Sequence, residues 1–164
     1  MVYFYGGAFC PMTLAHMNII DRIVNDMNKK DLLIIGITDH DYKKFQYSFE
    51  LRKEIVEKNL VKYAGKKIKL VKQTERTWKF LHNLGYSEYT LVVGEDEYND
   101  LKAGKWHYSN EILNTYRIKV IPRGDKISAT AAREIINRNI NDIKLLEYIS
   151  EITLKILKNE YSKY

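Results

Sequence analysis

Short apolar runs alternate with amphipathic segments along this chain. Apolar or aromatic runs at 3–5, 32–37, 67–71, 90–94 and 117–121 have the length and composition of strands. The run at 32–37 has almost no polar interruption, which is typical of a strand covered on both faces in a parallel sheet. The order of the segments therefore predicts repeated strand–helix–strand units.

Apolar residues recur every three to four positions between these strands, which predicts helices. We expect helices at 17–27, 48–63, 74–84, 110–115, 128–136 and from 141 onward, with loop and short helix mixed at 95–105. Ser48 is a candidate N-cap, and Gly85 is suited to the position after a helix end. The last helix is expected to carry one apolar stripe formed by Leu145, Ile149, Ile152 and Ile156.

The predicted fold class is α/β, a Rossmann-like open doubly wound parallel sheet of about five strands with flanking helices. The whole range 1–164 is expected to form a single domain, because repeats, low-complexity segments and linkers are absent from the sequence. Ligands of such sheets bind beyond the carboxyl ends of the strands, so we expect the polar segments that follow the strands to converge there.

The first of these segments follows the aromatic strand and leads into a helix. Gly6 and Gly7 allow backbone to approach a ligand closely, and the start of the following helix favours a phosphate. Thr13 and His16 are three residues apart, so they share one face of the first helical turn. A hydroxyl and an imidazole would thus point together at the mouth of the turn, unless the histidine is incidental to a strand–turn–helix.

This stretch resembles the (H/T)xGH signature of the nucleotidylyltransferase superfamily, with Ala15 in place of the usual glycine and Cys10 where many members carry Asp. The resemblance implies that Thr13 and His16 are catalytic residues that hydrogen-bond the phosphates of ATP. It also implies that ATP contacts the backbone of the preceding turn, formed by Gly6, Gly7, Ala8 and Phe9.

A second phosphate motif lies near the other end of the chain, after the fifth strand. Ser128 is placed to cap a helix and to bind an anion there, and Arg133 carries a permanently charged fork suited to phosphate. The stretch is similar to the superfamily's ISSTxxR signature, which implies that Ser128 and Thr130 bind ATP and that Arg133 is catalytic. An ordinary serine cap beside a surface arginine is the alternative.

A third set of residues points to the acceptor. Gly94-Glu95-Asp96 followed by Trp106 resembles a stretch of the nicotinate/nicotinamide mononucleotide adenylyltransferases, in which the Trp stacks on the pyridine ring. Thr74 resembles one of that family's Thr pair, although Glu75 and Arg76 replace the usual neighbours. The resemblance further implies acceptor contacts from a basic loop and the next helix, at Lys43, Lys44 and Arg52.

Composition restricts the remaining choices. The net charge of +6 suits a phosphorylated partner, but the lysines are scattered, so nucleic acid is not expected. No apolar run reaches the roughly 20 residues that span a bilayer, and no secretory signal is seen. The single cysteine fits a reducing compartment, and we expect a cytoplasmic protein without a dedicated metal site.

The resemblance implies an enzyme that transfers AMP from ATP to a pyridine mononucleotide, and we expect Mg²⁺ to bind with the triphosphate. Two alternatives stay open. One is the same reaction with another phosphorylated acceptor, such as phosphopantetheine or a polyol phosphate, and the other is a non-catalytic module that binds nucleotides or nucleic acid. The sequence does not choose between nicotinate and nicotinamide, and a homo-oligomer, common in the superfamily, is neither required nor excluded.

Overall fold

A computed structural model shows an α/β fold and describes residues 1–40, 44–122, 124 and 127–163. The strands are β1 (Val2–Gly7), β2 (Leu32–Thr38), β3 (Ile68–Gln73), β4 (Thr90–Gly94) and β5 (Arg117–Ile121). The helices are α1 (Leu14–Asp26), α2 (Phe49–Asn59), α3 (Thr77–Leu84), α4 (Glu95–Lys102), α5 (Ser109–Thr115), α6 (Ala129–Arg138) and α7 (Glu151–Tyr161). Two 3₁₀ turns, η1 (Val61–Tyr63) and η2 (Ile143–Glu147), complete the described elements. No helix among these residues is long and apolar enough to cross a membrane.

The five strands form one parallel sheet in the order β3-β2-β1-β4-β5. The chain builds outward from β1 through β2 to β3, then returns to place β4 on the other side of β1. This reversal between β1 and β4 is a topological switch point, where the loops that follow two adjacent strands diverge and leave a crevice. The predicted fold class is therefore confirmed, and the crevice lies beyond Gly7 and Gly94.

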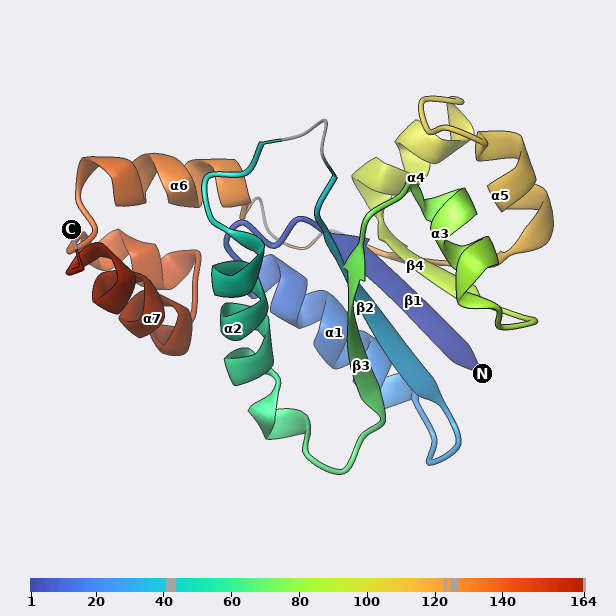
Figure 1. Cartoon of the computed structure of the whole chain (residues 1–164), viewed down its shortest axis with the longest axis horizontal. Helices are drawn as coiled ribbons and strands as arrows, with labels where there is room; N and C mark the ends of the chain where they lie inside the picture. Colours follow the sequence, from blue (N-terminus) through green and yellow to red (C-terminus); the bar gives the residue numbers. More distant parts are fainter. Residues whose placement is uncertain (41–43, 123, 125–126, 164) are drawn as a thin grey trace.

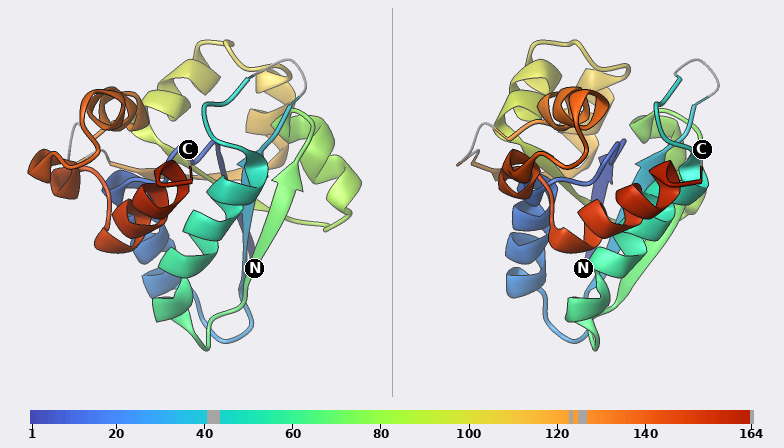
Figure 2. Two further views of the ribbon diagram at one scale, coloured as in Figure 1. Left: turned by 60° about the vertical axis from the view of Figure 1, so that its left-hand side comes forward. Right: turned by 90° about the vertical axis from the view of Figure 1, so that its left-hand side faces the viewer.

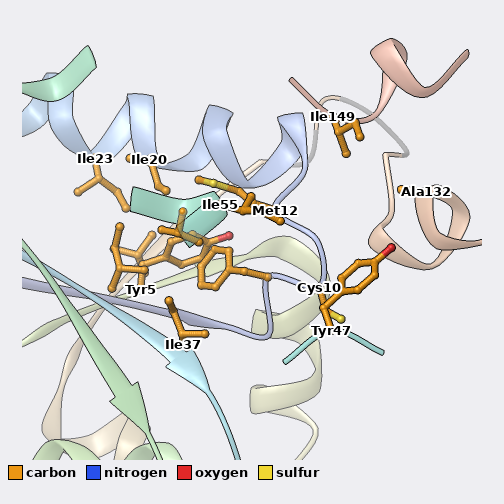
Figure 3. Close-up of a cluster of buried hydrophobic side chains, with 14 of the residues drawn as sticks. Tyr5, Cys10, Met12, Ile20, Ile23, Ile37, Tyr47, Ile55, Ala132 and Ile149 are labelled. Carbon is orange, nitrogen blue, oxygen red and sulfur yellow. The ribbon is translucent and has the colours of Figure 1, made fainter. Parts of the chain in front are cut away.

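Helices cover both faces of the sheet (Figure 1). Because side chains alternate along a strand, Tyr3 and Tyr5 enter one core while Phe4 enters the other. The first core packs β1 and β2 against α1, α2, α6 and α7, and the second packs them against α3, α4 and α5. Figure 2 shows the two sets of helices on opposite sides of the sheet, and Figure 3 shows part of the first core, including Tyr5, Met12 and Ile20.

The element boundaries differ from the predicted ones where local capping decides them. The C-terminal segment is not one helix, because Ser150 accepts a hydrogen bond from the Thr153 N–H at 3.1 Å and starts α7 after η2. Of the predicted stripe, Ile149 is buried but Ile152 is 47% exposed. The helix α3 begins at Thr77, three residues later than predicted, after the extended backbone of Arg76.

Candidate active site

The turn between β1 and α1 is closed by a reciprocal pair of hydrogen bonds. Thr13 is the N-cap of α1, and its Oγ1 accepts a hydrogen bond from the His16 N–H at 3.4 Å. In return, the Thr13 N–H donates to His16 Nδ1 at 2.8 Å, which completes a capping box. The predicted shared face of Thr13 and His16 is therefore present, and it closes the start of the helix.

This cap fixes the chemical state of the His16 imidazole. Because Nδ1 accepts from the Thr13 backbone, the neutral ring carries its proton on Nε2, which is left to donate elsewhere. Burial lowers the pKa of His16 to about 4, so the ring is neutral near pH 7. The Phe9 ring packs against it with centroids 4.9 Å apart and restricts its orientation. The imidazole is thus a fixed hydrogen-bond donor rather than a cation.

Two neighbouring glycines let a buried side chain lie across the ends of β1 and β2. A Cβ on Gly6 would come within 2.9 Å of Gln73 Oε1, and one on Gly36 within 2.7 Å of the Phe4 ring. Gln73 is buried, and its Nε2 donates to the Glu75 carbonyl at 3.1 Å. The glycines therefore admit the Gln73 amide to the floor of the crevice, a close approach that larger residues would prevent.

A cavity of about 320 Å³ opens on one side of the β1 end. Gly6, Gly7 and Gln73 contribute to its floor, and Trp106 supplies an aromatic wall. Its lining also holds four basic side chains and one acidic side chain, namely His40, Arg76, Lys105, His107 and Glu97. We call it the Trp106 cavity. An aromatic wall beside cationic groups is suited to a flat ring that carries an anionic substituent.

A second cavity of about 210 Å³ lies on the other side, against the start of α1, and we call it the His16 cavity. Its lining combines the apolar side chain of Ile19 with His16 and the first turn of α4, including Asp96. Glu97 is the one residue common to the two linings among those described, so the cavities adjoin at this side chain. Together they can take a ligand with two ring systems.

The structure places Arg52 inside the protein rather than in either cavity lining. Its side chain is fully buried, and its guanidinium donates to the Thr38 carbonyl at 2.7 Å and the Ala8 carbonyl at 2.9 Å. A further bond reaches the Tyr47 carbonyl, and a 3.0 Å ion pair joins it to Asp39. Arg52 therefore ties α2 to the turns that follow β1 and β2.

The residues of the second phosphate motif lie at the start of α6. Ser128 is the N-cap and accepts a hydrogen bond from the Ala131 N–H at 3.0 Å. Arg133 donates to the Cys10 carbonyl at 2.6 Å and to Thr130 Oγ1 at 3.2 Å. Arg133 thus links the start of α6 to the turn after β1, although none of the three motif residues lines the two cavities.

The other candidate residues lie at different distances from the cavities. Trp106 lines one cavity and Asp96 lines the other, whereas Thr74 is exposed and its neighbour Thr77 lines the Trp106 cavity instead. Lys44 is exposed and outside both linings, and Lys43 lies outside the described residues. The Phe9 side chain is buried, with φ of 49°, and the Ala8 carbonyl is taken by Arg52.

Several lining residues were not expected from the sequence. His107 belongs to none of the motifs found in the sequence, yet it lines the Trp106 cavity beside Gln73, Arg76 and Lys105. Glu97 carried no signal beyond its position in an acidic helix start. Arg76 and Thr77 lie in the segment that follows β3 toward the carboxyl edge of the sheet, which was the available clue, whereas the loop after α4 follows a helix and offered none. Among the described residues, no group of three or more His, Cys, Asp or Glu side chains could hold a metal ion.

Comparison with known proteins identifies the family of this chain. A sequence profile of the cytidylyltransferase-like family matches residues 4–152. The chain belongs to this family. A Fusobacterium nucleatum protein named "probable nicotinate-nucleotide adenylyltransferase" is 28% identical to this cytidylyltransferase-like chain over 167 aligned positions, which cover 96% of the chain and 79% of the relative.

Two solved structures share the fold of this cytidylyltransferase-like chain. Both are Plasmodium falciparum nicotinic acid mononucleotide adenylyltransferase, one complexed with APC and one with NaAD. The first has a TM-score of 0.75 at 18% identity and covers 98% of this chain and 95% of its own. The second has a TM-score of 0.73 at 21% identity, with 97% and 95% coverage. The architecture is therefore shared over nearly the whole length.

Proposed function

We propose that this chain transfers AMP from ATP to nicotinate mononucleotide, giving the corresponding dinucleotide and pyrophosphate. The observation that carries the proposal is the pair of adjoining cavities at the β1–β4 switch point, one walled by Trp106 and the other by His16. A dinucleotide has two ring systems joined through phosphates, and this arrangement offers one site for each. The names of the Fusobacterium and Plasmodium proteins support the same substrates.

ATP is assigned to the His16 cavity. Its apolar surface at Ile19 and its polar rim at Asp96 suit a base and a ribose. The triphosphate would then run past the turn Gly6, Gly7, Ala8 and Phe9 toward the N-terminus of α6, where Ser128 and Thr130 lie. Arg133, already linked to the Cys10 carbonyl, would contact the β- and γ-phosphates from there. Mg²⁺ would accompany the triphosphate, whose oxygens are its preferred ligands.

The acceptor is assigned to the Trp106 cavity, with its pyridine ring against the indole. The acid form of the ring is favoured because Arg76 and Lys105 line the same cavity and can pair with its carboxylate. Lys43 and Lys44 would steer the acceptor phosphate from the loop after β2. We assign Arg52 to holding that loop, because protein groups already accept its hydrogen bonds. Thr77, in place of Thr74, is the threonine we assign to this cavity.

In the reaction, an oxygen of the acceptor phosphate attacks the α-phosphorus of ATP. A new P–O bond forms, the bond from the α-phosphorus to the β-phosphate oxygen breaks, and pyrophosphate leaves with the electron pair. No protein nucleophile is required, so the chain acts by in-line positioning and by stabilising charge on the phosphates. His16 Nε2–H would donate to the phosphate oxygens during the transfer, and Thr13, whose Oγ1 lies 3.1 Å from His16 Nδ1, would hold the imidazole in position. A reducing compartment, the cytoplasm, suits the free and buried Cys10.

The proposal is tested by pyrophosphate release from ATP in parallel reactions with nicotinate mononucleotide, nicotinamide mononucleotide and phosphopantetheine. We expect release with nicotinate mononucleotide, and slower release with the amide, because Arg76 and Lys105 gain no charge pairing with a neutral amide. Release with phosphopantetheine alone would keep the reaction and overturn the acceptor. If a protein that binds ATP released no pyrophosphate with any of the three acceptors, the proposed enzymatic activity would be overturned and a nucleotide-binding module favoured.

A further inference from the structure

Glu97 lies where the Trp106 cavity and the His16 cavity meet. It lies in the first turn of α4 and is the residue shared by the linings of the Trp106 and His16 cavities within the described part of the chain. The Gly94 N–H hydrogen-bonds to its carboxylate, as in the return half of a capping box. The side chain is therefore held at the junction, where an acceptor ring bound against Trp106 would lie nearby.

The charged groups that line the Trp106 cavity are complementary to those of a pyridine mononucleotide. Glu97 is the single carboxylate among its described lining residues, which otherwise include the cationic or titratable groups of His40, Arg76, Lys105 and His107. Nicotinate mononucleotide carries a positive pyridinium ring together with a carboxylate and a phosphate. The basic groups have two anionic partners in this ligand, and Glu97 has one cationic partner.

We propose that the Glu97 carboxylate is an acceptor-binding group that pairs with the positive charge of the pyridinium ring, so that the acceptor binds to deprotonated Glu97. This inference rests on the proposed function and adds a recognition element to it. It explains why an acidic side chain stands at the junction although phosphates must pass close by. A neutral ring of the same shape would gain nothing from this residue.

The surroundings of Glu97 place its ionisation in the physiological range. Burial, and then the carboxylates of Asp100 and Asp96, raise its pKa to about 7, against the lowering effect of the Gly94 N–H. Burial raises the pKa of Tyr5 on β1 well above its ordinary value, and the charge of Glu97 raises it further. The other ionisable groups around the two cavities are His16, His40, Arg76, Glu95, Lys105 and His107.

The sign of the pH effect follows from this linkage. Above about pH 7 Glu97 is charged and ready to bind, whereas below it acceptor binding must first release a proton. The Glu97 contribution to acceptor affinity therefore falls about tenfold between pH 8 and pH 6. The two histidines in the cavity lining and the acceptor phosphate also titrate, so the contribution must be isolated by comparison with a variant.

The test compares wild type with Glu97→Gln, and with Glu111→Gln as a control on the exposed surface of α5, outside both cavity linings. Glutamine also serves at the third position of a helix, so the cap on α4 is retained. The readouts are KM for nicotinate mononucleotide and kcat from pH 6 to pH 8.5 at constant ionic strength. Calorimetric binding in buffers of different ionisation enthalpy gives the number of protons released.

For Glu97→Gln we expect KM to rise about tenfold at pH 8, with kcat changed far less, and the tenfold pH-dependent part of KM to disappear. Wild type should release about half a proton on binding at pH 7, and the variant should release less. A KM–pH profile of Glu97→Gln that parallels wild type would overturn the inference and leave Glu97 as a helix cap only. Failure of wild type to bind any pyridine mononucleotide would overturn the proposed function, and the inference with it.

Discussion

At the residue scale, His16 joins the start of α1 to a candidate ligand cavity. Its Nδ1 is used by the Thr13 N–H, so the ring is held in one tautomer with Nε2–H free to donate into the His16 cavity. The three-residue spacing predicted the shared face of Thr13 and His16. It did not predict the tautomer, because that depends on the extended backbone of Thr13, at φ −107° and ψ 170°.

His16→Ala is predicted to fold and to lose about 100- to 1000-fold in kcat for pyrophosphate release. The reason is that a lost transition-state donor costs roughly 3–4 kcal/mol of activation free energy. The Thr13 cap stays in place, and loss of the hydrogen bond from the Thr13 N–H to His16 Nδ1 adds about 1 kcal/mol of destabilisation, which is small enough to leave the protein folded.

The measurement for His16→Ala is steady-state kinetics alongside denaturant unfolding. His82→Ala, an exposed change on α3 outside both cavity linings, is the control and should match wild type. A folded His16→Ala protein with undiminished kcat would contradict the role given to the imidazole.

The sequence pattern could not predict that Glu97, Arg76 and His107 line the same cavity. Each residue comes after a strand or a helix near the crevice. Whether its side chain lines the cavity depends on the direction in which that side chain points. A sequence pattern gives the face of a regular helix or strand, whereas loop side chains such as His107 have no period from which to predict a direction.

At the scale of elements, buried polar contacts set the relative positions of the helices and the loops of the crevice. Arg52 on α2 bonds to carbonyls after β1 and β2, and Arg133 on α6 bonds to the Cys10 carbonyl. Both arginines were predicted to face a ligand. For Arg52 the geometry favours a structural tie, because its neighbours supply acceptors within 3.1 Å and its side chain is buried.

Arg52→Met is therefore predicted to lower the free energy of unfolding by at least about 3 kcal/mol, since buried carbonyls would lose a charged donor. Urea unfolding followed by circular dichroism measures this change. Lys53→Met is the matched control, because Lys53 is 43% exposed and its pair with Glu57 is worth about 0.5 kcal/mol or less. A loss below 1 kcal/mol for Arg52→Met, with a large rise in acceptor KM, would instead return Arg52 to a ligand-binding role.

Apolar periodicity predicted the strands and most helices, because those patterns are local. The break between η2 and α7 was missed, since the stripe of Leu145 and Ile149 has helical spacing across it. Serine at position 150 is a residue type that often caps helices, but serine is also common outside caps, so its presence alone did not predict a helix start. The Ser150 hydroxyl also donates to Asn59 Oδ1 of α2 at 2.6 Å, a contact between distant segments that no local pattern predicts.

At the scale of the whole molecule, strand order brings the separated motifs together. The motif after β1 and the segment after β4 are more than 70 residues apart in sequence, yet β1 and β4 are neighbours in the sheet. Alternation of strands and helices predicted the fold class, and the switch point then predicted a crevice at this edge. The division of the crevice into two cavities that adjoin at Glu97 follows from packing and required the structure.

In the proposed reaction, the AMP unit moves intact from ATP to the acceptor. The most direct measurement follows ATP labelled at the α-phosphate, incubated with the protein, Mg²⁺ and nicotinate mononucleotide, with separation of the products by chromatography. We predict that the label appears in the dinucleotide, with one pyrophosphate formed for each dinucleotide. Label that stays in ATP, or that is released as free AMP without dinucleotide, would contradict the account.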